Sequence, residues 1–199
     1  CASCIYAKQA RKAWRTTKSN APVRNHLDKT PGGRMHADHF QCSQPGLIPR
    51  RTGKLMHKWF VGGTLYVDGH TGFKYTHLQT TLDGDETLAG KKDLERRARS
   101  MDVTIQSYHS DNGRFADKKF TDDVALSTQT ITFCGVGAHH QNPLAENGIK
   151  HTSLRARSLL THARLMWPEA ISSSLWPFAW RAAIDAENNA IDEKGHTCS

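Results

Sequence analysis

The sequence predicts an α/β fold in which a mixed sheet of five strands is flanked by helices. Two observations predict it. Short runs that alternate apolar and polar residues come first, and later segments carry apolar residues at every third or fourth position between further short strands. The order along the chain is three strands, a helix, a strand, a helix, a strand and two helices. A length of 199 residues with 37% hydrophobic residues suits one globular domain plus a short appendage.

Three antiparallel strands are expected at the start of this domain. Residues 34–40 place Met35, Ala37 and His39 on one face and His36, Asp38 and Phe40 on the other. Two more strands are predicted at 59–67 and 73–78, joined by a turn whose sequence is Asp-Gly-His-Thr-Gly. These three segments form the first half of the predicted sheet.

Helices and the remaining strands alternate in the second half. A helix capped by Asp85 is expected to carry Leu88, Leu94, Ala98 and Met101 on one side. A strand at 103–108, a helix at 117–126 and a strand at 130–134 follow. Asn142 at the N-cap and Pro143 at the first helical position predict the start of a long helix. Its apolar stripe is Ala145, Ile149, Thr152, Ala156, Leu159 and Ala163.

A last helix is expected to begin near Pro168, to be disturbed at Pro177, and to bury Phe178, Ala182 and Ile184. The first residues of the chain differ from all of these elements. Residues 1–33 are expected to form a basic arm, helical over 5–15, that ends in a linker closing with Pro31-Gly32-Gly33. The core is expected over 34–190, with a tail at 191–199.

The net charge of +8 is concentrated in the arm. Residues 1–24 contain six basic residues and no acid, which leaves 21 basic and 19 acidic residues in the remainder. Such an arm suits the neutralisation of phosphates, so a nucleic-acid partner is favoured. A solvated basic linker without a partner is the alternative, and charge alone does not separate the two.

The five cysteines indicate a reducing compartment, because their number is odd and only Cys1 and Cys4 are close in sequence. The spacing of this pair is that of half a zinc site, and residues 5–25 supply no further ligands. The chain begins with Cys, so we expect it to be a piece of a longer protein. No apolar run approaches the roughly 20 residues of a membrane span, and no secretion leader is apparent.

Three carboxylates are candidates for a metal site. Asp38 lies on the first strand, Asp111 follows the fourth, and Glu146 lies in the first turn of the long helix. If the first and fourth strands are neighbours, their ends bring the three together, and the site would need divalent cations to stay ionised. Oxygen ligands suit Mg²⁺ or Mn²⁺, and two such ions serve phosphodiester chemistry. Each residue also has a local explanation, in a strand end, a turn and a helix dipole.

Two motifs strengthen the interpretation that these carboxylates form a metal site. Ser-Asp-Asn-Gly-Arg-Phe at 110–115 is followed by His-Gln-Asn-Pro-Leu-Ala-Glu at 140–146, so that Asp111 and Glu146 are 35 positions apart. Together with His36-Ala37-Asp38, these motifs resemble the integrase catalytic core of LTR retrotransposons, particularly the copia type, which is part of a Gag-Pol polyprotein. The resemblance runs from Cys1 to about Asn189 and is most specific over 108–146.

The resemblance implies a ribonuclease-H-like fold and a catalytic triad of Asp38, Asp111 and Glu146 that holds two Mg²⁺ or Mn²⁺ ions. Asp68 is the alternative for the first position, although its Asp-Gly turn explains it sufficiently. The activity implied is metal-dependent 3′-end processing and strand transfer of element DNA into target DNA. His36 and His109 are regarded as bystanders.

The resemblance further implies DNA as partner, a homo-oligomer, no membrane, and a location in the nucleus or in a cytoplasmic virus-like particle. Cys1 and Cys4 would complete a His-His-Cys-Cys zinc domain only with upstream histidines. The residues expected to bind nucleic acid are all basic: Lys8, Arg11, Lys12, Arg15, Lys150 and Arg155.

Two departures from the family pattern support a second hypothesis. Pro143 stands where the family commonly has Gly, and Gly148 lies inside the helix, where Gly costs about 1 kcal/mol relative to Ala. The second hypothesis is therefore a catalytically inactive integrase remnant that binds DNA. A ribonuclease H acting on RNA·DNA hybrids is a third.

Overall fold

The structure is a computed structural model that describes residues 3, 5, 29–49, 57–135 and 142–190. Its strands are β1 (Met35–Gly46), β2 (Phe60–Asp68), β3 (Lys74–Gln79), β4 (Ser107–Ser110) and β5 (Thr130–Phe133). Its α-helices are α2 (Gly84–Arg99), α3 (Lys118–Leu126), α4 (Pro143–Met166) and α5 (Trp176–Asn188). Two 3₁₀ turns, η2 (Arg114–Ala116) and η4 (Ser173–Leu175), precede α3 and α5.

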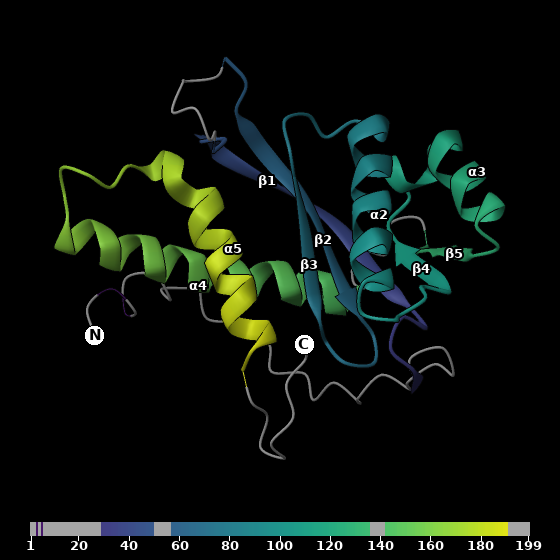
Figure 1. Cartoon of the computed structure of the whole chain (residues 1–199). Coiled ribbons are helices and arrows are strands. Elements are labelled where there is room, and N and C mark those ends of the chain that lie inside the picture. Colours follow the sequence, from purple (N-terminus) through teal and green to yellow (C-terminus); the bar gives the residue numbers. More distant parts are fainter. Residues whose placement is uncertain (1–2, 4, 6–28, 50–56, 136–141, 191–199) are drawn as a thin grey trace.

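The five strands form one mixed sheet in the order β3-β2-β1-β4-β5 (Figure 1). β1, β2 and β3 pair antiparallel, whereas β4 pairs parallel with both β1 and β5. The predicted α/β class, the element order and the three initial antiparallel strands are therefore confirmed. In Figure 1, α2 lies in front of the strands and α4 passes behind them.

Each face of the sheet has its own core, and the alternation of β1 sorts residues between the two. Met35 and Ala37 pack with Leu94 of α2 and Phe120 of α3. Phe40 points to the other face, where its ring stacks on Trp180 of α5 at a centroid distance of 3.9 Å. Asp38 shares the alternation of Phe40 and therefore lies on the α4 and α5 face.

Helix α4 approaches β2 closely at Gly148. A Cβ atom on this glycine would lie 3.0 Å from Cδ2 of Leu65 and 3.0 Å from Cγ2 of Val67. Gly148 therefore lets the helix pack directly on the sheet, which offsets its poor helix propensity. Pro143 lies in the first turn of α4, where a missing N–H costs no helical hydrogen bond.

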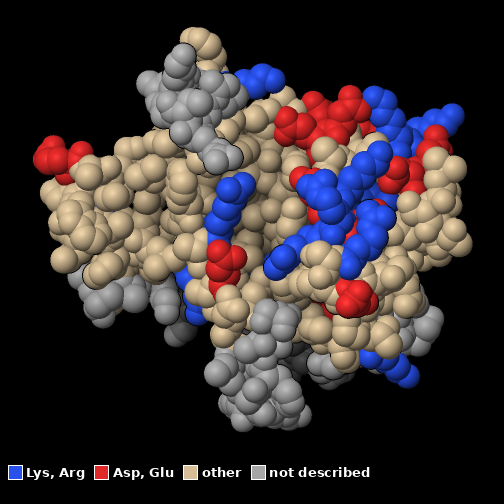
Figure 2. Space-filling view, in the orientation of Figure 1, with Lys and Arg blue, Asp and Glu red and all other residues tan. Residues whose placement is uncertain are grey.

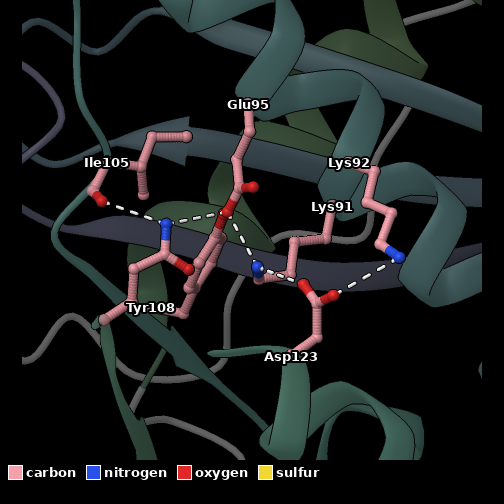
Figure 3. A network of polar contacts seen from close by, with 7 residues as sticks. Lys91, Lys92, Glu95, Ile105, Tyr108 and Asp123 are labelled. Carbon is pink, nitrogen blue, oxygen red and sulfur yellow. Dashed lines mark hydrogen bonds and ion pairs between the residues drawn. The ribbon is translucent and has the colours of Figure 1, made fainter. Parts of the chain in front are cut away.

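A buried lysine joins the helices on the opposite face (Figure 3). Lys91 of α2 has no exposed side-chain surface, and its Nζ atom lies 2.8 Å from Oε1 of Glu95 and 2.7 Å from Oδ2 of Asp123 on α3. Glu95 Oε1 also accepts hydrogen bonds from the Tyr108 hydroxyl and the Gln129 amide. Two carboxylates thus neutralise Lys91, and the network connects α2, α3 and β4.

The fourth strand begins later than predicted. Residues 103–106 carry an alternating pattern, yet the N–H of Val103 bonds the carbonyl of Ala98 and the N–H of Gln106 bonds the carbonyl of Gly32. These bonds hold the segment against α2 and the Gly32 loop, so the ladder with β1 starts only at Met35 and Tyr108. Ile105 is buried nevertheless, which explains the misleading pattern.

Two predicted helix starts are wrong. The N-cap of α2 is Asp83, whose Oδ1 accepts from the N–H of Glu86, and Asp85 belongs to the first turn. Helix α5 begins at Trp176, so Pro177 occupies its first turn and does not disturb it.

The buried faces of the last two helices also differ from prediction. The face of α5 includes Trp180 and Ile184, whereas Phe178 is 43% exposed and Ala182 is exposed. Leu159 of α4 was expected in the core and is 41% exposed, because the C-terminal part of the helix extends past the strands (Figure 1). No helix in the described ranges is both long and apolar enough to cross a membrane.

Candidate metal-dependent active site

The parallel pairing of β1 and β4 brings the first two carboxylates together. Ala37 is the register partner of Ser110, so Asp38 and Asp111 are the residues that directly follow this pair. The first and fourth strands are therefore neighbours, which is the condition on which the three-carboxylate interpretation depends. Two carboxylates far apart in sequence therefore leave the same end of the β1–β4 ladder.

The N-terminus of α4 is fastened to β1 beside this point. Asn142 is 3% exposed, and its Nδ2 donates to the carbonyl of Ala37 over 2.9 Å. Its Oδ1 lies 3.2 Å from Nδ1 of His36. The Asn142 carbonyl accepts from the N–H of Glu146 at 3.1 Å, so one residue connects the strand of Asp38 to the turn of Glu146.

The three carboxylates interact electrostatically. Burial and the negative charges of Asp111 and Glu146 together raise the pKa of Asp38 to about 6, with burial the largest cause, while a hydrogen bond from the N–H of His39 (2.8 Å) opposes the change. This pattern means that the Asp38 carboxylate is partly desolvated and lies within the field of both other acids. The arrangement disfavours three simultaneous negative charges unless a cation compensates them.

Asp111 itself is exposed and lies in a turn. Its Oδ1 accepts from the N–H of Gly113 at 3.2 Å, and the neighbouring Asn112 donates through Nδ2 to the carbonyl of Cys134 at 3.0 Å. The turn is therefore tied to the end of β5. The Asp111 carboxylate is therefore accessible to a ligand from solvent, on a turn that hydrogen bonds hold in place.

A histidine and a cysteine line the same region. Nδ1 of His109 lies 2.8 Å from the Thr132 hydroxyl, and Nε2 lies 3.7 Å from Sγ of Cys134. Burial raises the pKa of the Cys134 thiol, and the charges of Asp111, Asp38 and Glu146 add to this effect. The thiol is therefore held in its neutral form, which argues against a nucleophilic role.

His39 and His36 flank Asp38 on its own strand. Burial lowers the pKa of His39 to about 4, although the charge of Asp111 opposes this, and its Nε2 lies 3.0 Å from the Thr87 hydroxyl. His39 faces α2, on the side of the sheet opposite Asp38. His36 faces α4, and its ring centroid is 5.4 Å from that of His109.

Asp68, the alternative first carboxylate, is occupied by its own turn. It is 4% exposed, and Oδ1 accepts from the N–H of Gly32 while Oδ2 accepts from the N–H and the hydroxyl of Thr71. Its register partner is Met35, at the beginning of β1. These bonds give Asp68 a structural role at the hairpin.

The predicted nucleic-acid-binding residues and the two candidate zinc ligands divide into three groups. Lys150 is exposed on α4. Arg155 is 46% exposed in its side chain and lies 3.9 Å from Oε1 of Glu187 on α5. The other residues lie outside the described residues, so the structure does not place them: Cys1, Cys4, Lys8, Arg11, Lys12 and Arg15.

Within the described ranges, no group of three or more His, Cys, Asp or Glu side chains is arranged to hold a metal ion. The donor set at Asp38, Asp111 and Glu146 nevertheless fits a hard divalent cation, because all of its donor atoms are oxygens. The charges of Asp111 and Glu146 raise the pKa of Asp38, and a bound cation would offset this repulsion. Asn142 was the residue whose role the sequence did not reveal. Its position before Pro143 predicts a helix cap, and only its tertiary contacts show the bond to β1.

No protein-family model matches the chain, and no curated protein matches it. Solved structures do match. The HTLV-2 integrase catalytic core domain in complex with magnesium, in its trimeric form, is 15% identical over 83% of this chain and 92% of that chain, with a TM-score of 0.55. The catalytic core domain of BIV integrase is 15% identical over 83% and 90% of the two chains, with a TM-score of 0.57.

A chain of the simian T-cell lymphotropic virus intasome in complex with PP2A regulatory subunit B56 gamma is 13% identical. It covers 92% of this chain and 59% of that chain, with a TM-score of 0.60. At identities this low, the matches show that the folds are alike. They do not show which reaction this chain catalyses. The chain has the ribonuclease-H-like fold of retroviral integrase catalytic cores, a five-stranded mixed sheet with flanking helices.

Proposed function

We propose that this chain contains the catalytic core of a copia-type LTR retrotransposon integrase, with the core at 34–190, a preceding arm at 1–33 and a tail at 191–199. The observation that carries the proposal is the convergence of three carboxylates: the β1–β4 register places Asp38 beside Asp111, and the contacts of Asn142 bring the turn of Glu146 to the same strand. It occurs where β1, β4 and the start of α4 meet, on the fold shared with integrase cores.

Asp38, Asp111 and Glu146 are assigned to hold Mg²⁺ or Mn²⁺. The HTLV-2 integrase core is described in complex with magnesium, which supports this choice of ion. When bound, a pair of divalent ions stabilises the attacking and leaving oxygens of a phosphodiester displacement. The contribution of the protein is to present three oxygen ligands from separate elements, two of them fixed by strand register and one by the Asn142 contact.

The proposed reaction has two steps. Water first cleaves a phosphodiester bond near the 3′ end of the element DNA and leaves a 3′ hydroxyl. This hydroxyl then loses its proton and attacks a target phosphorus, and the target 3′ oxygen leaves and takes up a proton. No covalent link to the protein forms, which agrees with the neutral, buried Cys134 and with carboxylates as the reactive set.

The proposal includes DNA partners and self-association. The HTLV-2 core is described in a trimeric and in a dimeric form, and the simian virus chain belongs to an intasome. A nuclear location or a virus-like particle in the cytoplasm follows from this function. Zn²⁺ at Cys1 and Cys4 belongs to the proposal only together with histidines from an upstream segment.

Strand transfer is the decisive measurement. The purified chain is incubated with Mn²⁺ and a labelled duplex carrying an element end, and products longer than the substrate are resolved on a denaturing gel. Asp111→Asn is expected to abolish these products, while Asp122→Asn, an exposed aspartate on α3, retains them. Equal activity of the parent and Asp111→Asn would refute the assignment.

The second candidate is an inactive integrase remnant that binds DNA. It is favoured by the finding that the described residues contain no ready-made group of three metal ligands. This candidate predicts salt-dependent DNA binding without metal-dependent cleavage, so any Mn²⁺-dependent nicking that Asp111→Asn removes would exclude it. A ribonuclease H is tested in the same assay by replacing the duplex with an RNA·DNA hybrid.

A further inference from the structure

A thiol stands in line with the two aspartates at the end of the sheet. His36 of β1 is the register partner of His109 on β4, and His109 is the partner of Thr132 on β5. Side chains two positions apart share a face of a sheet. The residues two positions beyond these three are, in the same order, Asp38, Asp111 and Cys134. The N–H of Cys134 bonds the carbonyl of Ser110 over 2.9 Å, so the pairing continues to this point.

Hydrogen bonds orient the ring of His109. Its Nδ1 lies 2.8 Å from the Thr132 hydroxyl, and that hydroxyl donates to the carbonyl of Tyr108 at 3.3 Å. Because the hydroxyl hydrogen is used in this way, its oxygen accepts from Nδ1–H, and the lone pair of the neutral ring lies on Nε2. Nε2 faces Sγ of Cys134. Histidines that bind metals are commonly held by such a bond from their second ring nitrogen.

The separation of the two donor atoms suits one tetrahedral ion. Sγ of Cys134 lies 3.7 Å from Nε2 of His109. Two ligands of Zn²⁺, with bonds of about 2.3 Å to sulfur and about 2.0–2.1 Å to nitrogen, lie about 3.6 Å apart at a tetrahedral angle. An ion therefore fits between these atoms with little movement of either side chain, once the thiol has lost its proton.

Asp111 can supply a third donor. Its side chain is exposed, and its charge is the second cause, after burial, that raises the pKa of the Cys134 thiol. Asn112 donates to the carbonyl of Cys134 at 3.0 Å and so holds the turn of Asp111 beside the thiol. No group of three donors is preformed in the described parts of the chain, so Asp111 must rotate to complete the set. Water then takes the fourth position.

The charge around this site differs from that on the α2 face. Figure 2 shows Lys and Arg gathered over α2 with Asp and Glu among them. Lys92 pairs with Asp123, and Arg96 pairs with Asp93. In contrast, none of the three carboxylates of the candidate active site forms an ion pair with any Lys or Arg that the structure describes. Their negative field therefore attracts a divalent cation.

We propose that Cys134, His109 and Asp111 form a Zn²⁺ site beside the proposed Mg²⁺ site, and that Zn²⁺ bound there inhibits the reaction. Sulfur and imidazole donors select Zn²⁺ over Mg²⁺, which prefers oxygen. The ion replaces the proton of the thiol, and this proton passes to solvent. Asp111 then binds Zn²⁺ and is withdrawn from the oxygen site. The inhibition rests on the proposed function, whereas the binding does not.

Binding is tested with Co²⁺ as a spectroscopic substitute for Zn²⁺, in the absence of Mg²⁺ and DNA. The full chain carries C1S, C4S and C198S in every sample, because these cysteines lie outside the described residues and offer other thiolates to the metal. Thiolate-to-cobalt charge-transfer absorption is expected to appear during the titration. It should disappear when Zn²⁺ displaces Co²⁺.

Variants of this chain identify the ligands. C134S should abolish the charge-transfer absorption, and C42S, which removes a partly buried cysteine of β1, should keep it. T132V removes the bond that orients His109 and should weaken binding by about tenfold to a hundredfold. H109Q and D111A each remove a ligand and should weaken it more. Circular dichroism establishes that each variant is folded. Unchanged absorption in C134S, or parental affinity in H109Q or D111A, overturns the site.

Inhibition is measured separately, in the strand-transfer assay with Mn²⁺. Zn²⁺ at about ten times its measured dissociation constant should leave the chain with about a tenth of its own activity without Zn²⁺. C134S should keep most of its own activity at the same concentration. Equal inhibition of both chains overturns the inhibitory role. A chain without strand transfer refutes the proposed function, and the Co²⁺ titration decides the Zn²⁺ site in either case.

Discussion

The side-chain amide of Asn142 donates to the carbonyl of Ala37 over 2.9 Å and joins the start of α4 to the residue before Asp38. Asn142 occupies the N-cap position, yet its side chain makes no capping bond to the helix. A cap contributes about 1 kcal/mol to a helix, so the contact with β1 replaces a favourable local interaction. This contact, together with the packing of α4 on β2 at Gly148, positions Glu146 relative to Asp38.

Asn142→Ala is expected to lower the free energy of unfolding by about 1–3 kcal/mol, because it leaves the buried Ala37 carbonyl without its partner. Urea denaturation measures the change. Asn147→Ala removes an exposed amide one turn further on and should stay within about 0.5 kcal/mol of the parent. Similar losses for both variants would show that the hydrogen bond from Asn142 to β1 does not contribute to stability as described.

Asp38→Asn tests the electrostatics of the site. Burial and two neighbouring acids raise the pKa of Asp38 to about 6 from 3.8, so the folded chain binds its proton more readily than the unfolded chain. The free energy of unfolding therefore falls as the pH rises from about 4 to about 6. The neutral variant does not lose stability in this way, so its free energy of unfolding should exceed that of the parent by about 1 kcal/mol at pH 8. This figure includes a discount, because solvent screens a partly exposed carboxylate.

The difference between parent and Asp38→Asn should shrink at pH 4.5, where the carboxyl group in the folded parent is largely protonated. Thermal unfolding at both pH values provides the comparison. Asp122→Asn, at an exposed position on α3, should show no such pH-dependent gain. If Asp38→Asn and the parent differ equally at pH 4.5 and pH 8, the carboxylate cluster is not coupled as described.

Lys91→Met addresses the network on the other face of the sheet. Removing the buried ammonium leaves Glu95 without a cation and leaves Asp123 with the exposed Lys92 alone, so stability should fall by about 2–4 kcal/mol. Lys92→Met is the matched control, since Lys92 is 58% exposed and pairs with the same Asp123. It should cost less than about 1 kcal/mol. Equal costs in chemical denaturation would contradict the role given to Lys91.

Gly148→Ala has two opposing effects on stability: helix propensity favours the alanine, and packing against β2 favours the glycine. Alanine is favoured over glycine in a helix by about 1 kcal/mol, but its Cβ would lie 3.0 Å from atoms of Leu65 and Val67. Both neighbours are buried, so they cannot move away without disturbing the core, and a net loss of about 1–2 kcal/mol is expected. Asn147→Ala serves again as the control without this contact. A stabilised Gly148→Ala variant would show that α4 moves freely on β2.

Local sequence patterns predicted the structure correctly where residues close in sequence determine it. Alternation in β1 separates Met35 and Ala37 from Asp38 and Phe40, and the structure confirms this division. Pattern failed where tertiary contacts override it. Residues 103–106 alternate like a strand but bond the end of α2 and Gly32, and the true start of α5 depends on tryptophans that pack on Phe40.

The sequence by itself determined the fold class, the order of elements and the three carboxylates to examine, because periodicity and turn residues act over a few positions. Tertiary structure decided which residues meet. The β1–β4 register places Asp111 beside Asp38, and folded contacts turn Asn142 from a helix cap into a bond across elements. Burial and the charges of two distant acids raise the pKa of Asp38. Such effects arise from neighbours distant along the chain, which no local pattern encodes.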